Sequence, residues 1–167
     1  LEVLADIASE YRYRPLRADA DTLAIFVSQS GETADTLAAL RKARSEGARC
    51  LAVTNVRGST LAREVHDTLL LRAGPEIGVA ATKTFMGQMG TLYALALYLG
   101  LKRGGVSSAE AKRLSEGLLQ LPYRVEALLT RLDASVRALA ARYAGARSFL
   151  FLGRGHSYPV ALEGALK

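Results

Sequence analysis

The chain has 167 residues, of which 50% are hydrophobic and 23% charged, and its formal net charge is +6. This composition is typical of an ordinary globular protein and excludes a disordered or fibrous chain. The basic residues form no run of five or more and are not interleaved with aromatic residues as a stacking platform would require, so the pattern argues against nucleic acid as a partner.

Apolar periodicity in the first part of the chain alternates between strand and helix. Apolar runs without alternation predict buried strands, and apolar residues at helical spacing predict the helices between them. The expected elements are strands at 22–27, 49–54 and 67–71 and helices at 33–46 and 59–65. Strands that alternate with helices require right-handed crossovers, so we expect an α/β fold with a doubly wound parallel sheet in a three-layer αβα arrangement.

The remainder of the chain is predicted to be mainly helical. We expect a long helix at 82–102, a second helix that starts at Ser108, is kinked by Pro122 and continues to Tyr143, and then a strand at 148–152 followed by another helix. The last strand and its loop indicate that a second strand-loop-helix unit begins there.

Three regions follow from this pattern. The loop at 152–157 resembles the loop after the first strand, at 27–31, which indicates a duplicated fold. We therefore expect a first unit at 1–105, a helical connector at 106–146, and the start of a second, similar unit at 147–167.

The loop at 28–33, Ser-Gln-Ser-Gly-Glu-Thr, is the most distinctive segment chemically. It presents three hydroxyls, an amide and a glycine directly ahead of a helix, whose N–H groups and dipole favour an anion. Ligands of open α/β sheets bind at this edge, beyond the carboxyl ends of the strands. The loop has no lysine and neither of the nucleotide-binding glycine patterns, so we expect a small phosphorylated ligand. On composition alone, the same residues could equally serve only to cap the helix.

Location can also be judged from the sequence. The single cysteine, Cys50, lies in an apolar run, so we expect no disulfide and a reducing compartment, the cytoplasm. The longest apolar stretch, 89–101, falls short of the roughly 20 residues that span a bilayer, and no cleavable leader is recognisable, so we expect no membrane partner. Because Leu1 is not methionine and Lys167 stands within a helical pattern, the sequence looks like an excerpt of a longer protein.

Four segments, in order along the chain, carry a resemblance to a known family. They are 8–14, 28–37, 76–83, and 152–155 together with 158–167. The second segment is similar to the signature of sugar-isomerase (SIS) domains, and the four together resemble the SIS domain of the glutamine:fructose-6-phosphate amidotransferase family. The resemblance implies a flavodoxin-like SIS fold that binds fructose 6-phosphate or glucosamine 6-phosphate.

The resemblance also implies roles for individual residues. Those that would hold the sugar phosphate are Ser28, Gln29, Ser30 and Thr33. Those whose backbone would line the sugar pocket are Val79 and Ala80, while the following Ala81 stands where family members commonly carry serine. Lys167 matches a lysine at the reacting end of the sugar, where an amine can move protons or polarise a carbonyl. No cofactor and no metal are implied.

The family's reaction passes ammonia to the ketose carbon of fructose 6-phosphate and isomerises the product to glucosamine 6-phosphate for amino-sugar biosynthesis. The resemblance therefore implies that the first unit lacks its first strand, which would precede Leu1 together with a glutaminase domain. It also implies a general base and a ring-opening histidine after Lys167, and a homodimer in which a neighbouring subunit completes the active site. The chain by itself is expected to be inactive.

Alternatives remain open at this point. Another sugar-phosphate isomerase or deglycase with the SIS fold would share the phosphate loop, and a sugar-phosphate-sensing regulatory domain would keep the loop without catalytic residues. A purely structural oligomerisation domain would leave the loop unexplained. Glu163 and Lys167 are also spaced as an ion pair on a helix surface, a role that we assign to Glu163 while keeping the catalytic role for Lys167.

Overall fold

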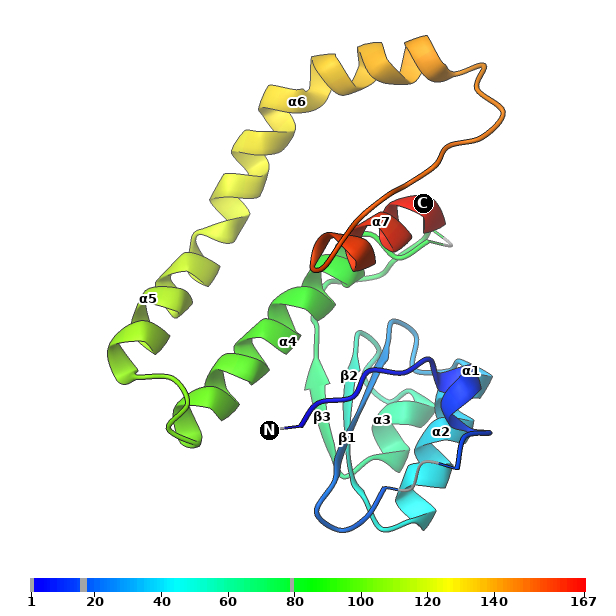
Figure 1. Ribbon diagram of the computed structural model, residues 1–167, viewed down its shortest axis with the longest axis vertical. Coiled ribbons are helices and arrows are strands. Elements are labelled where there is room, and N and C mark those ends of the chain that lie inside the picture. The colour runs from blue at the N-terminus through cyan, green and yellow to red at the C-terminus, as the bar shows by residue number, and fades with distance from the viewer. Residues whose placement is uncertain (1, 16–17, 79) are drawn as a thin grey trace. The chain divides into compact units, whose positions relative to one another are not determined.

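The computed structural model describes residues 2–15, 18–78 and 80–167. The chain divides into two compact units, Leu1–Ala96 and Leu97–Lys167, and each is described by itself. The first unit contains a parallel sheet with helices, which confirms the predicted α/β class (Figure 1). The predicted boundaries at 105 and 146 stay predictions.

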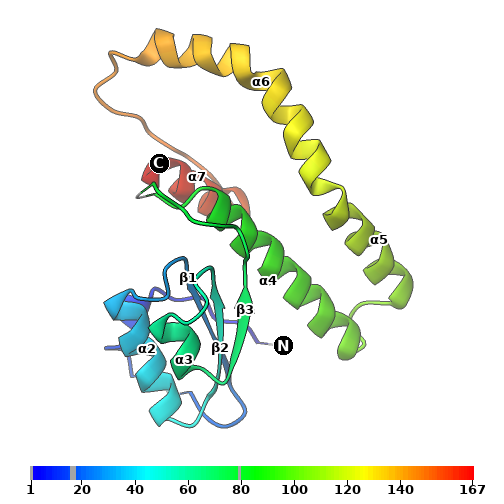
Figure 2. The same ribbon diagram turned by 180° about the vertical axis from the view of Figure 1, so that it is seen from behind.

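The sheet of the first unit has three parallel strands in the order β1-β2-β3. They are β1 (Leu23–Ser28), β2 (Arg49–Thr54) and β3 (Asp67–Leu70). Val27 of β1 lies opposite Val53 of β2, which in turn lies opposite Leu69 of β3. The two connecting helices, α2 (Ala34–Ser45) and α3 (Thr60–Glu64), lie side by side on one face (Figure 2). Right-handed crossovers between neighbouring parallel strands place both helices there.

The hydrophobic core lies between the sheet and α2. In β1 the side chains of Phe26 and Ser28 are buried, whereas Ile25 and Val27 are exposed on the opposite face, because alternate residues of a strand point to opposite faces. Leu40 of α2 is fully buried, as its position in the predicted apolar stripe requires. The core cluster consists of Ala18, Phe26, Leu37, Ala39, Leu40, Ala43, Ala48, Cys50, Ala52 and Leu61.

A short helix that the sequence did not predict, α1 (Ala8–Tyr11), packs against α2. Lys42 of α2 fastens this segment by donating hydrogen bonds to the carbonyl oxygens of Tyr11 at 2.9 Å and Arg14 at 2.5 Å. The Tyr11 hydroxyl faces Glu46. The pKa of Tyr11 is raised, mainly because the side chain is partly buried and also because the Glu46 carboxylate is close. The segment at 8–14 is therefore held by a side chain more than twenty residues away in the sequence, which local patterns do not reveal.

In the part of the chain after β3 that the structure describes, there are four helices. They are α4 (Lys83–Lys102), α5 (Ser108–Leu119), α6 (Leu121–Tyr143) and α7 (Ser157–Leu166). The predicted kink at Pro122 is confirmed, since a single residue, Gln120, separates the end of α5 from the start of α6. The proline occupies the first turn of α6, where its missing N–H costs nothing. Among the helices that the structure describes, none combines the length and apolar character needed to cross a membrane.

The strand predicted at 148–152 is wrong. This segment has no regular secondary structure and is paired with no strand among the described residues, and Leu150 and Leu152 are more than four-fifths exposed. A β-strand exists only through hydrogen bonds to a neighbouring strand, so an apolar run predicts a strand correctly only where a partner is supplied. The helix predicted after it is confirmed as α7.

Candidate functional site

Three loops meet at the carboxyl edge of the sheet, the upper edge in Figure 1. They follow the three parallel strands, whose carboxyl ends share one edge. The N–H of Asn55, after β2, donates to the Gln29 carbonyl oxygen, after β1, at 3.2 Å. The Asn55 side-chain Nδ2 donates to the Gly74 carbonyl oxygen, after β3, at 2.7 Å. The predicted binding edge is therefore a single hydrogen-bonded surface made from three segments of the chain.

The first of these loops, 28–33, carries four of the predicted site residues: Ser28, Gln29, Ser30 and Thr33. Its hydroxyls shape the loop, because Ser28 Oγ accepts from the Gly31 N–H at 3.0 Å and Ser30 Oγ accepts from the Glu32 N–H at 3.2 Å. Ser28 is buried, whereas Gln29 and Ser30 are half-buried and Thr33 is exposed. The structure thus brings these four residues together ahead of α2, with Gln29, Ser30 and Thr33 reachable from solvent.

Thr33 differs from the other hydroxyl caps of the chain. The side chains of Ser59 and Ser107 accept hydrogen bonds from the first turns of α3 and α5, at 3.3 and 3.2 Å. Thr33 is the N-cap of α2, but its side chain makes no capping hydrogen bond. The simple capping interpretation of this residue therefore fails. The first N–H groups of a helix have no partner within the helix and favour an anion at this position.

Charge near the start of α2 is balanced. Asp35 lies in its first turn, where a carboxylate would repel a phosphate, and Arg12 pairs with it at 2.9 Å. Glu32 is directed away from this helix, because its Oε1 accepts a hydrogen bond from the Thr60 N–H at the start of α3, at 2.7 Å. That bond is the first cause of the lowered pKa of Glu32. Both carboxylates next to the loop are thus bound by other groups of the protein, Asp35 by Arg12 and Glu32 by the Thr60 N–H.

The loop after β3 carries the second predicted group. Val79 lies outside the described residues. Ala80 is half-buried, and its carbonyl oxygen accepts a hydrogen bond from the Thr82 hydroxyl at 3.2 Å. Glu76 closes this loop, because its Oε2 accepts from the N–H groups of Thr82 and Thr84 at 3.2 and 3.0 Å.

Sequence reasoning missed three residues that build the edge: Glu32, Asn55 and Glu76. The partners of Glu32 and Asn55 are 28 and 19 residues away in the chain, so no local spacing indicates them. Glu76 could have been identified from a local pattern, because it is a carboxylate shortly before the start of a helix whose first turn offers N–H donors.

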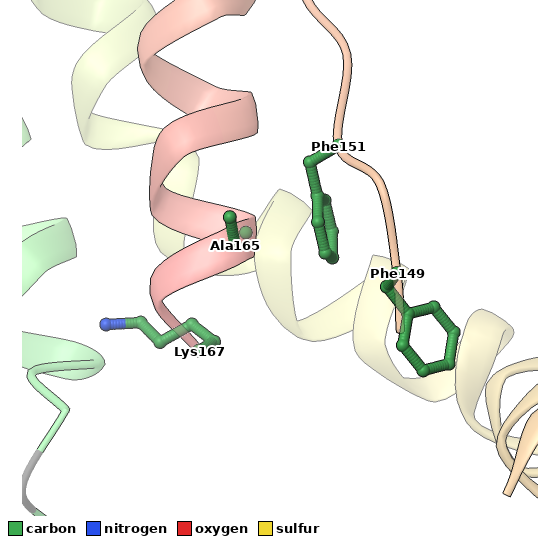
Figure 3. A pocket seen from close by; sticks show the side chains of 5 residues that line it. Phe149, Phe151, Ala165 and Lys167 are labelled. Atoms are coloured by element: carbon green, nitrogen blue, oxygen red, sulfur yellow. The ribbon is translucent and has the colours of Figure 1, made fainter. Parts of the chain in front are cut away.

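Lys167 belongs to the second unit. Its Nζ lies 2.6 Å from Glu163 Oε1, and among the described residues this oxygen makes no aligned hydrogen bond, so the contact is electrostatic. The ion-pair role assigned to Glu163 is confirmed. A cavity of about 430 Å³ is lined by Phe149, Phe151, Gly164, Ala165 and Lys167. The Lys167 side chain extends away from the two phenylalanine rings (Figure 3).

The comparisons with known proteins agree with this fold. A model of the SIS domain family matches residues 3–98, more than half of the chain. The chain belongs to the SIS domain family. The resemblance to amidotransferases found in the sequence is confirmed by the relatives that follow.

Two curated relatives and one solved structure illustrate the likeness. A Clostridium tetani protein named glutamine–fructose-6-phosphate aminotransferase (isomerizing) is 48% identical over 167 residues, which is 100% of this chain and 27% of the relative. The protein of the same name from Thermus thermophilus is 50% identical over 162 residues, 97% of this chain and 27% of the relative. The C-terminal domain of glucosamine-fructose-6-phosphate aminotransferase from Francisella tularensis is 36% identical with a TM-score of 0.91, covering 96% of this chain and 46% of that one. The chain spans about a quarter of the curated relatives' length.

Proposed function

We propose that this chain is the sugar-phosphate-binding part of a glutamine–fructose-6-phosphate aminotransferase (isomerizing), which in the whole protein makes glucosamine 6-phosphate for amino-sugar biosynthesis. The observation that carries the proposal is the loop at 28–33, in which hydroxyls and helix N–H groups converge at the carboxyl edge of a parallel sheet. The names of relatives about half identical to the chain support the same activity.

In this proposal the phosphate is bound by the side chains of Gln29, Ser30 and Thr33 together with the N–H groups at the start of α2. Ser28 belongs to the same group, because its hydroxyl accepts the Gly31 N–H and keeps its own proton to donate to the phosphate. The positive end of the α2 dipole favours the dianion without a lysine or arginine in the loop. The backbone at Val79 and Ala80 lines the sugar.

Lys167 has the catalytic role in this proposal: its amine acts at the carbonyl end of the sugar, polarising the carbonyl or moving a proton. The ion pair with Glu163, at 2.6 Å, holds the Lys167 side chain along α7. We also propose the remaining features of the family for the whole protein: a glutaminase domain that supplies ammonia, a homodimer and a cytoplasmic location. The glutamine in the relatives' names supports the first of these.

Calorimetric titration of the chain tests the phosphate contact. We expect binding of fructose 6-phosphate and glucosamine 6-phosphate but not of glucosamine, because the loop recognises the phosphate. Ser30→Ala should weaken binding of either phosphate by about 1–3 kcal/mol, the usual loss for a hydrogen bond to a charged group. Ser135→Ala is the matched control, since that hydroxyl only donates to the Leu132 carbonyl oxygen within α6. Equal affinity for glucosamine and its 6-phosphate would overturn the proposal.

A further inference from the structure

The described residues of the segment that joins β3 to α4, 71–78 and 80–82, form no regular secondary structure, yet the segment is anchored at both ends. Near its start, Asn55 uses both polar atoms of its amide: Oδ1 accepts from the Ala73 N–H at 3.0 Å, and Nδ2 donates to the Gly74 carbonyl oxygen at 2.7 Å. The preceding Arg72 has a φ of 54°. A non-glycine residue keeps this left-handed conformation only where its surroundings impose it, and the Asn55 amide supplies that constraint.

At its far end, the segment is closed by Glu76. Besides the two N–H groups of Thr82 and Thr84, its Oε2 accepts the Thr84 hydroxyl at 2.5 Å. Thr84 is fully buried, and its surroundings restrict the movement of this end of the segment. Hydrogen bonds from Asn55 therefore hold the start of the segment, at Ala73 and Gly74, and hydrogen bonds to Glu76 hold its end, at Thr82 and Thr84.

Asn55 also connects this segment to the phosphate loop. Its backbone N–H donates to the Gln29 carbonyl oxygen, so one residue contacts the loop after β1 through its main chain and the loop after β3 through its side chain. A phosphate loop by itself distinguishes poorly between different phosphate compounds. Discrimination requires a second surface at a set distance, where the remainder of the ligand is contacted.

We propose that Asn55 and Glu76 are positioning residues that hold the segment at 73–84 at a set distance from the phosphate loop, and so make the site selective for a hexose phosphate over smaller phosphates. This inference rests on the proposed function. Neither side chain needs to touch the ligand, because both polar atoms of the Asn55 amide and Oε2 of Glu76 are already bonded to the segment. Their effect is to pre-organise the backbone around Ala80, which would otherwise lose conformational freedom on binding.

The test is calorimetric titration of the chain with two ligands, fructose 6-phosphate and inorganic phosphate. Asn55→Leu has a similar size and removes both polar atoms that bond to Ala73 and Gly74, without adding a charge near the phosphate loop. Thr84→Val removes the hydroxyl donor to Glu76 at nearly constant volume, and Thr84→Ser restores it. We expect Asn55→Leu and Thr84→Val to weaken the binding of fructose 6-phosphate about tenfold, the scale of a lost hydrogen bond to a charged or buried group. Inorganic phosphate should bind all variants equally, and Thr84→Ser should behave as the unmodified chain.

The outcomes separate the two proposals. If the unmodified chain binds neither ligand, the proposed function fails. If it binds both and Asn55→Leu leaves fructose 6-phosphate affinity unchanged, the positioning role is overturned. It is equally overturned if the affinities for both ligands fall in parallel, because the substitution then acts on the phosphate loop or on folding in general. Should Thr84→Val fail to fold, the comparison of Asn55→Leu with Thr84→Ser still decides the question.

Discussion

Gly31 lies so close to Ser59 that a Cβ atom at position 31 would stand 2.2 Å from the Ser59 hydroxyl oxygen. The backbone of Gly31 is also left-handed, with a φ of 66°. Glycine is therefore required here twice, for conformation and for space. This contact sets the phosphate loop directly on the start of α3.

Gly31→Ala should destabilise the chain by about 2–5 kcal/mol, adding steric overlap to the cost of a left-handed alanine, and should abolish sugar-phosphate binding. Gly58→Ala is the matched control, because Gly58 has a φ of 81° but nothing within 4 Å of its added Cβ. It should cost only about 1–2 kcal/mol. Urea denaturation measures both, and equal losses would show that the contact with Ser59 does not constrain the loop.

Removing the Arg12 guanidinium should weaken binding of a sugar phosphate. Arg12→Gln leaves Asp35 unneutralised in the first turn of α2, where its charge opposes that of the phosphate. We expect a loss of about twofold to fivefold in affinity, the size of a partly exposed charge effect near a helix terminus. The double variant Arg12→Gln/Asp35→Asn should restore affinity, and the loss should shrink at high salt. Failure of the second substitution to rescue would exclude the electrostatic cause.

Acid should weaken the hydrogen bonds that the Glu76 carboxylate accepts from Thr82 and Thr84. Hydrogen bonds from the Thr84 hydroxyl and the Thr84 N–H, in that order, lower the pKa of Glu76 in the folded protein. A carboxyl group with a lowered folded pKa stabilises the protein at pH values above its unfolded pKa, and this contribution disappears as the pH falls through the folded pKa. Unfolding free energy measured from neutral pH downward should therefore fall less steeply in Glu76→Gln and in Thr84→Val. If the unfolding free energy of both variants depends on pH below neutrality as it does in the unmodified chain, the stabilising role of Glu76 is contradicted.

Core packing predicts the largest loss for Leu40. This side chain is fully buried against the sheet, so Leu40→Ala should cost about 2–5 kcal/mol through lost burial and a cavity. Leu119 is 72% exposed at the end of α5, so Leu119→Ala should change stability by less than about 0.5 kcal/mol. Thermal or urea unfolding compares the two. Similar losses would mean that α2 does not form the core described here.

Features that depend on neighbouring residues were predictable from the sequence. The apolar run around Val53 and the helical spacing around Leu40 identified the strand and helix of the first unit within one or two residues of their bounds. The order of these elements then placed the loop at 28–33 at the carboxyl edge. The motif of that loop identified the family that the comparisons confirmed.

Features that depend on distant partners were not predictable. The segment at 148–152 has the composition of a strand, but composition does not supply a partner strand. The short helix α1 depends on Lys42, and the contacts of Glu32 with Thr60 and of Asn55 with Gly74 join different loops.

By itself, the sequence determined the type and order of the elements in the first unit, the phosphate loop and the family, because each follows from residues that are close together in the chain. Only the tertiary structure decided how the three loops are joined at the edge of the sheet. Strand register and crossover direction bring Gln29, Asn55 and Gly74 within hydrogen-bonding distance, and neither is expressed in any one segment of sequence.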